Sequence, residues 1–160
     1  MNPRGRSDGS RAHSIRRAEP GDVEVVRSLL REYSDGLGLD LSFQGFAAEL
    51  ADPLRFYEVV LLAEGGCAEG GCAALRRIDD RRCELKRLYV RQSVRGSGLG
   101  RRLAEAAIAE ARRRRYKRML LDTLPAMSAA RALYESLGFR DTDPYRSNPV
   151  PGATFLELRL

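Results

Sequence analysis

Two spacings of apolar residues alternate along this chain, one typical of helices and the other of strands. Apolar positions three and four residues apart predict helices from Pro20 to about Tyr33, from Ser42 to Leu50, after Gly98, and around Tyr134. Short apolar runs bounded by Gly, Pro or Asp predict strands at 14–18, 58–64, 71–78, 83–90, 119–123 and 154–160, with a further strand beginning at Phe139. The predicted order is β-α-α-β-β-β-α-β-α-β-β, which indicates an α/β protein.

The length of 160 residues fits one domain, which we place at residues 15–160. Residues 1–14 are rich in Arg, Gly and Ser and have no apolar core, so we expect a disordered lead-in rather than a secretory signal. No apolar run approaches the roughly 18 residues of a membrane span. The glycines of Gly36-Leu37-Gly38 are expected to break the first helix.

The most informative segment is a glycine-rich turn between the strand that ends at Val90 and the following helix. Gly96, Gly98 and Gly100 allow a ligand to approach the backbone closely, because no Cβ stands in the way. The start of the helix presents unpaired N–H groups and a partial positive charge. This combination predicts a phosphate-binding site.

The spacing within this turn narrows the kind of phosphate site. A Walker loop needs a lysine that is missing here, and the third glycine is misplaced for a dinucleotide fingerprint. What fits is Arg-x-x-Gly-x-Gly, with Arg95, Gly98 and Gly100 at the fixed positions. Directly after a strand that ends Leu-Tyr-Val, this pattern resembles the acyl-CoA pyrophosphate loop of the GCN5-related N-acetyltransferases (GNAT). The alternative is a plain glycine-rich turn from strand to helix.

A second motif also resembles this family. Ala129 to Phe139 reads AARALYESLGF, which is similar to the family's Ala-x-x-Leu-Tyr-x-x-x-Gly-Phe. The resemblance covers roughly Ile15 to Leu160 and implies the GNAT fold, a central mixed sheet with helices on both faces. Met127 departs from it, because the family often has an asparagine there near the cofactor arm.

The resemblance implies an N-acetyltransferase that moves the acetyl group of acetyl-CoA, as cosubstrate, to a primary amine of a small molecule or peptide. The backbone of Leu88 and Val90 is then expected to pair with the pantetheine arm, and the N–H groups from Arg95 through Arg101 to hold the pyrophosphate. The full set of implied cofactor-binding residues is Leu88, Tyr89, Val90, Arg95, Gly96, Ser97, Gly98, Gly100 and Arg101.

Two side chains are candidates for proton transfer. Glu84 stands six residues before Val90, where several family members carry a base glutamate, and strand alternation puts it on one face with Lys86, Leu88 and Val90. Its alternative role is an ion pair with Lys86 or a neighbouring strand. By resemblance, Tyr134 is the acid that protonates the departing thiolate; by helical spacing alone it is a core residue.

Resemblance also places the acceptor site between the first two helices and the last hairpin. The residues concerned are Tyr33, Phe43, Gln44 and Phe46 on one side, and Tyr145 and Asn148 on the other. Phe43 and Phe46 have the alternative of packing in the core. These aromatic and amide groups suit a small acceptor at least as well as a protein tail.

Composition limits the remaining classes of function. The net charge is +6, and Arg112 to Arg115 form a basic run at a helix end, which is typical of a solvated terminus or of polyanion binding. No nucleic-acid motif accompanies it, so a nucleic-acid module is the weakest alternative, after a non-catalytic acyl-CoA sensor. Three cysteines without metal spacing favour a reduced cytoplasmic setting and no metal. The segment 155–158 fits either an internal strand or the edge of a homodimer.

Overall fold

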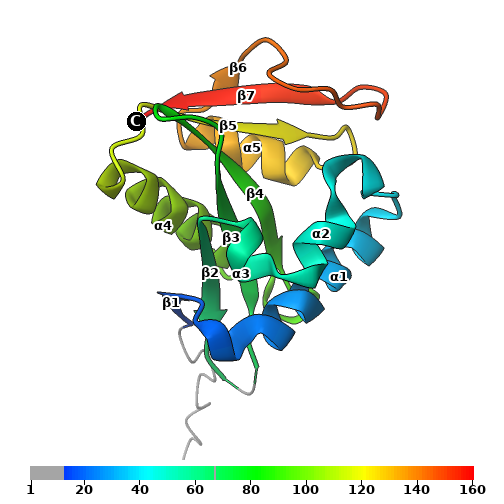
Figure 1. Ribbon diagram of the computed structural model, residues 1–160, viewed down its shortest axis with the longest axis vertical. Coiled ribbons are helices and arrows are strands. Elements are labelled where there is room, and N and C mark those ends of the chain that lie inside the picture. The colour runs from blue at the N-terminus through cyan, green and yellow to red at the C-terminus, as the bar shows by residue number, and fades with distance from the viewer. Residues whose placement is uncertain (1–12, 67) are drawn as a thin grey trace, which may run out of the picture.

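The computed structural model describes residues 13–66 and 68–160, and its centre is a seven-stranded mixed sheet (Figure 1). The strands are β1 (Ser14–Arg17), β2 (Val59–Glu64), β3 (Gly71–Arg77), β4 (Arg82–Val90), β5 (Arg118–Thr123), β6 (Arg140–Asp141) and β7 (Thr154–Arg159), in the spatial order β1-β2-β3-β4-β5-β7-β6. Neighbours are antiparallel except β4 and β5, which are parallel. The predicted α/β class and the predicted order of strands and helices along the chain are confirmed, apart from the additional short helix described below.

Helices cover both faces of this sheet. The α-helices are α1 (Val23–Leu37), α2 (Phe46–Ala51), α3 (Pro53–Phe56), α4 (Leu99–Arg113) and α5 (Ser128–Ser136), and the 3₁₀ turns are η1 (Pro20–Asp22), η2 (Ser42–Gln44) and η3 (Gln92–Val94). In Figure 1, α4 lies on the left of the upright strands, α1 and α2 extend to the right, and α3 lies in the middle in front of the strands. The sheet therefore has an apolar core on each side.

Each core follows from the apolar stripe of its helices. Val26, Leu29 and Leu30 of α1 are buried against β2 and β3, as the helical spacing predicts. On the opposite face, α4 buries the whole predicted stripe of Leu99, Leu103, Ala104, Ala107, Ile108 and Ala111. These two cores fix the sheet from both sides and leave the carboxyl end of β4 to form the site.

The helix boundaries near the N-terminus differ from those predicted. Gly36 does not break α1, which continues to Leu37 and ends at Gly38, where the backbone turns left-handed with φ +62°. The predicted helix at 42–50 is divided, because Gly45 also has a left-handed φ of +73°. The short α3 is not predicted. Of the expected lead-in, residues 1–12 lie outside the described residues, while Ser14 already belongs to β1.

A bulge in β4 overturns one prediction about the site. Ala74 pairs with Lys86 but Cys72 pairs with Tyr89, so β4 holds one extra residue there, and Arg87 takes a positive φ of 55°. One extra residue reverses the alternation of faces. Leu88 and Val90 therefore pack with the α4 core, whereas Lys86 and Tyr89 face the α1 side. The prediction that all four alternate positions from Glu84 share a face is wrong.

The last strand is internal. β7 pairs with β5 over Thr154–Arg159 on one side and with β6 at Leu156 and Glu157 on the other. Of the two readings of segment 155–158, the structure has the internal strand, so the edge-pairing argument for a homodimer has no support.

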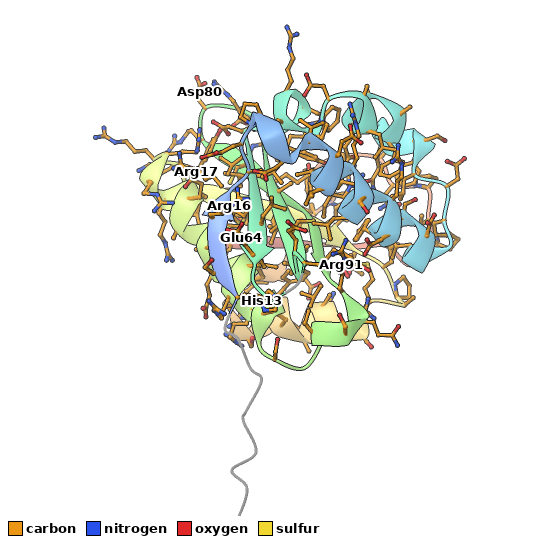
Figure 2. The ribbon with its side chains drawn as sticks, turned by 90° about the horizontal axis from the view of Figure 1, so that it is seen from below. His13, Arg16, Arg17, Glu64, Asp80 and Arg91 are labelled. Carbon is orange, nitrogen blue, oxygen red and sulfur yellow. The ribbon has the colours of Figure 1, made fainter. Side chains whose placement is uncertain are left out.

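At the other side of the sheet, β1 is held to β2 by side chains as well as by its ladder. Arg16 Nε donates to Glu64 Oε2 at 2.9 Å, and Figure 2 shows these two side chains close together.

No helix in the described ranges is long and apolar enough to cross a membrane.

Candidate active site

The site begins where β4 and β5 separate. Their parallel pairing runs from Arg82 with Arg118 to Glu84 with Leu120 and then ends, although β4 continues to Val90. The side of β4 that faces β5 is thus left without a strand partner beyond Glu84. A gap between parallel strands is a common place for a ligand, because free backbone groups and loop residues converge there.

A cleft of about 600 Å³ opens beside this part of β4. That volume lies within the range usual for cofactor and small-ligand sites. It is lined by every predicted cofactor residue except Ser97, that is by Leu88, Tyr89, Val90, Arg95, Gly96, Gly98, Gly100 and Arg101. The Ser97 hydroxyl instead donates to the carbonyl of Val94 at 2.7 Å. Met127, at the family's asparagine position, lines the cleft as well.

The glycine turn has the backbone that the sequence predicts. Gly96 and Gly98 have φ of +81° and +80°, and α4 begins at Leu99. Left-handed backbone here favours glycine. The first residues of α4, whose N–H groups have no acceptor within the helix, line the cleft. Arg95 Nε donates to the carbonyl of Val90 at 2.9 Å, so this side chain bridges the turn and the strand.

A second, narrower cavity adjoins the cleft. Both are lined by Tyr33, Leu37, Leu88 and Met127, so they meet at these four residues. The narrow cavity is also lined by Tyr134, Lys86, Arg87, Asp122, Gln44, Phe43 and Asn148. Its walls come from α1, η2, β4, β5, α5 and the loop before β7, and they carry most of the charged groups at the site.

Tyr134 reaches the narrow cavity from α5. Its side chain is only 5% exposed and its ring packs against Phe139 at a centroid distance of 5.6 Å. No hydrogen bond within the described ranges involves its hydroxyl. Burial raises the pKa of the hydroxyl, and the nearby Tyr33 and Asp122 add to the rise. Tyr134 therefore brings a protonated hydroxyl to the cavity wall that has no partner among the described residues.

Glu84 is buried beside two cations. Its Oε1 lies 3.1 Å from Lys86 Nζ and 3.5 Å from an Arg146 nitrogen. The contact with Lys86 is an ion pair rather than an aligned hydrogen bond. Glu84 lines neither cavity, whereas Lys86 lines the narrow one, so Lys86 lies between this carboxylate and the space for a ligand. The predicted pairing with Lys86 is present, and the predicted catalytic role stays a prediction.

Lys86 is the buried amine of the site. Its Nζ donates to Gln44 Oε1 at 3.1 Å, and its side chain is 3% exposed. Burial lowers the pKa of Lys86 to about 8, even though Glu84 acts to raise it. About half of Lys86 is therefore neutral at a pH only one unit above neutrality.

Asp122 is a functional candidate that the sequence reasoning missed. It lies near the end of β5, where its Oδ2 accepts from Arg146 at 2.6 Å and from Asn148 Nδ2 at 2.8 Å. Burial acts to raise the pKa of Asp122, but Arg146 outweighs it and the pKa lies below its usual value. The available signal is a single carboxylate within the apolar strand Met-Leu-Leu-Asp-Thr.

The expected acceptor walls are confirmed in part. Tyr33, Phe43, Gln44 and Asn148 line the narrow cavity. Two other predicted wall residues, Phe46 and Tyr145, do not line it. Phe46 packs against the α1 core beneath Arg87, and the ring of Tyr145 lies 5.5 Å from that of Phe155.

The narrow cavity depends on one further buried pair. Arg87 donates through Nε and Nη2 to the two oxygens of Glu49 at 2.8 and 2.9 Å, which joins β4 to α2. Both side chains are almost fully buried. Over the described ranges, no group of three or more His, Cys, Asp or Glu side chains is arranged to hold a metal ion.

This sequence and fold are similar to those of known acetyltransferases. The profile of the acetyltransferase (GNAT) family matches residues 27–139. An uncharacterised N-acetyltransferase of Schizosaccharomyces pombe is 38% identical over 148 residues, which span 88% of this chain and 90% of that protein. An acetyltransferase from Streptococcus agalactiae has the same fold, with a TM-score of 0.76, 22% identity, and coverage of 93% of this chain and 99% of the other. A Salmonella typhimurium protein solved with its cofactor acetyl-CoA is 26% identical, with a TM-score of 0.67 and coverage of 92% and 94%.

Proposed function

The chain belongs to the acetyltransferase (GNAT) family, and we propose that it transfers the acetyl group of acetyl-CoA to a primary amine of a small molecule or peptide. The observation that carries this proposal is the meeting of two cavities at Leu88 and Met127, with Tyr134 in the wall of the narrow one. A thioester held in the larger cleft and an amine held in the narrow cavity would face each other there.

The larger cleft is the proposed acetyl-CoA site. Its volume, its glycine turn and the N-terminus of α4 suit a ligand with a long arm and a pyrophosphate. The free edge of β4 offers backbone groups to the amide-containing arm, in the manner of an added strand. The Salmonella typhimurium relative, which holds acetyl-CoA, supports this choice of ligand.

Acetyl transfer makes two demands on proton chemistry. An alkyl ammonium with a pKa near 10.4 must lose its proton, which costs about 4–5 kcal/mol at pH 7. The thiolate must gain one as the C–S bond breaks. We assign the second role to Tyr134, because it lines the narrow cavity and no hydrogen bond within the described ranges involves its protonated hydroxyl.

We assign the base function to Glu84 acting through Lys86. Neutral Lys86 takes the proton of the acceptor ammonium, and Glu84 stabilises the resulting lysine ammonium from 3.1 Å away. The neutral acceptor then attacks the acetyl carbon, and the electron pair of the C–S bond leaves on sulfur, which takes the proton of Tyr134. The second proton of the attacking nitrogen returns to the tyrosine, and Lys86 releases its proton to solvent.

Two alternatives use the same chain differently. A non-catalytic acyl-CoA sensor would bind the cofactor without turnover. A nucleic-acid module would use the basic run at the end of α4, but Arg113 and Arg114 there are paired with Glu110, and Arg114 also with Glu58. These pairs reduce the free positive charge of the run.

A cytoplasmic location stays a prediction.

Release of free thiol from acetyl-CoA tests the proposal. The protein is mixed with acetyl-CoA and a panel of primary amines, and thiol is followed with a colorimetric reagent. Amine-dependent release that saturates with both substrates supports an acetyltransferase. Tight binding of acetyl-CoA without release for any amine or peptide supports the sensor, and absence of acetyl-CoA binding contradicts both.

A further inference from the structure

We propose that Asp122 binds the ammonium group of the acceptor. This inference rests on the proposed acetyl transfer and adds to it the residue that recognises the charge of the acceptor. Three observations carry it: the unused oxygen of Asp122, the charge balance around the narrow cavity, and the neighbourhood of Asp122 and Tyr134.

The two oxygens of Asp122 have different surroundings. Oδ2 takes both hydrogen bonds, from Arg146 at 2.6 Å and from Asn148 at 2.8 Å. Oδ1 accepts none from the part of the chain that the structure describes, although the side chain is 13% exposed and lines the cavity. An ionised carboxylate oxygen can accept hydrogen bonds, and those to charged donors are the strong ones. The geometry thus leaves one strong acceptor for a ligand.

The charges around the cavity leave room for one cation. Glu84 and Asp122 contribute two negative charges, and Arg146, which contacts both, contributes one positive charge. Arg87 is neutralised separately by Glu49. The remaining negative charge is balanced either by Lys86 when it is protonated or by a bound ammonium when Lys86 is neutral.

This charge balance couples binding of the acceptor to loss of the proton from Lys86. An ammonium at Asp122 repels a proton on Lys86, because both cations would share one uncompensated negative charge. Binding of the substrate therefore favours the neutral Lys86 that the transfer needs. An uncharged acceptor nitrogen or a hydroxyl group has no such effect and gains only an ordinary hydrogen bond to Oδ1.

Asp122 also shares the narrow cavity with residues that border the larger cleft. Asp122, Tyr134 and Tyr33 line the same narrow cavity, and Tyr33 also lines the larger cleft. An ammonium at Oδ1 would therefore bring its nitrogen toward the thioester rather than toward the far wall at Phe43. The remaining groups that face Asp122 are Lys86 from β4 and Arg146 with Asn148 from the loop before β7.

The test compares Asp122→Asn with the wild type and with Asp143→Asn, an exposed aspartate outside the site. The best acceptor among a panel of primary alkylamines, free amino acids included, is first found by thiol release. The alcohol with the same carbon skeleton is then measured as a competitive inhibitor. We expect Asp122→Asn to raise the KM of the amine by about 10- to 100-fold, the usual effect of losing a hydrogen bond between charged groups. Inhibition by the alcohol should stay within about twofold, because a neutral group gains little from charge.

Three controls separate this role from a structural one. Acetyl-CoA binding should be the same in Asp122→Asn and Asp143→Asn. Asp122→Asn should still unfold in one cooperative transition, with a lower Tm than Asp143→Asn because Arg146 loses a charged partner. Asp122→Glu, which keeps the charge, should recover part of the lost affinity. An unchanged amine KM in a folded Asp122→Asn overturns the assignment, as does a best acceptor that is a weakly basic arylamine or an alcohol. So does acetyl-CoA binding without turnover of any alkylamine. Failure to bind acetyl-CoA contradicts the proposed function itself.

Discussion

Lys86 Nζ lies 3.1 Å from Glu84 Oε1, and both side chains are at least 95% buried. The sequence pattern predicts this ion pair as one of two roles for Glu84, and the structure contains it. Glu84 has the position expected of a base, but only Lys86 lines the cavity. The pair therefore determines how the pH dependence of the reaction should look.

The first prediction concerns this pH dependence. Because neutral Lys86 is needed and its pKa is about 8, kcat/KM should rise with pH and level off above about 8. Below that pH the neutral fraction falls about tenfold per unit. Glu84→Gln removes a charge that raises the pKa of Lys86, so the midpoint should move to lower pH. An unchanged midpoint in this variant would show that the pair does not control the reaction.

The second prediction uses the only other lysine of the chain as a control. Lys86→Gln should lower kcat by about 10²-fold or more, the usual effect of losing a general base. Lys117→Gln changes an exposed lysine in the same way and should leave kcat as it is. Equal kcat in all three proteins would remove Lys86 from the mechanism.

The third prediction separates an enzyme from a sensor. Tyr134→Phe should reduce kcat by about 10²-fold while the Kd of acetyl-CoA stays the same. Its stability should change by less than about 0.5 kcal/mol, because no hydrogen bond within the described ranges involves the Tyr134 hydroxyl. Tyr116→Phe is the matched control, since that hydroxyl donates to Glu58 at 2.5 Å. It should lose about 1–3 kcal/mol of stability and no activity.

The fourth prediction concerns the glycine turn. Gly98→Ala forces a side chain into a backbone with φ +80°, at a cost of about 1–2 kcal/mol, and should weaken acetyl-CoA binding measured by calorimetry. Gly38→Ala imposes a similar strain at φ +62°, at the end of α1 and outside the lining of the cleft. It should lose similar stability but keep its affinity. Equal affinity in both variants would argue against the turn as the pyrophosphate site.

The fifth prediction concerns the wall of the narrow cavity. Glu49→Ala leaves Arg87 buried without a partner and should cost about 3–5 kcal/mol in the free energy of unfolding. Asp80→Ala breaks an exposed pair with Arg77 and should change stability by less than about 0.5 kcal/mol. Denaturant unfolding of the two variants provides the comparison, and a similar small effect in both would show that the buried pair does not hold α2 to β4.

The order of elements along the chain, the apolar stripes and the glycine turn beside the cleft could be predicted, because each follows from a local pattern. The stripe of α4 and the left-handed glycines at 96 and 98 are examples. The bulge at Arg87 could not, because an extra residue in a strand depends on pairing with β3, and no local pattern at Arg87 marks it. Asp122 was missed for a related reason. Its role in the site depends on its neighbours Arg146, Asn148 and Lys86, which the fold brings together from separate segments.

Thermal unfolding with acetyl-CoA, with ATP and NAD as controls, tests the central claim most directly. A ligand at 100 times its Kd should stabilise the folded protein by about 2.7 kcal/mol. For a domain of this size, that free energy corresponds to an increase in Tm of roughly 5–11 °C. We expect this increase with acetyl-CoA and not with ATP or NAD. No increase, or an equal one with all three ligands, would contradict the assignment of the cleft beside β4 as an acetyl-CoA site.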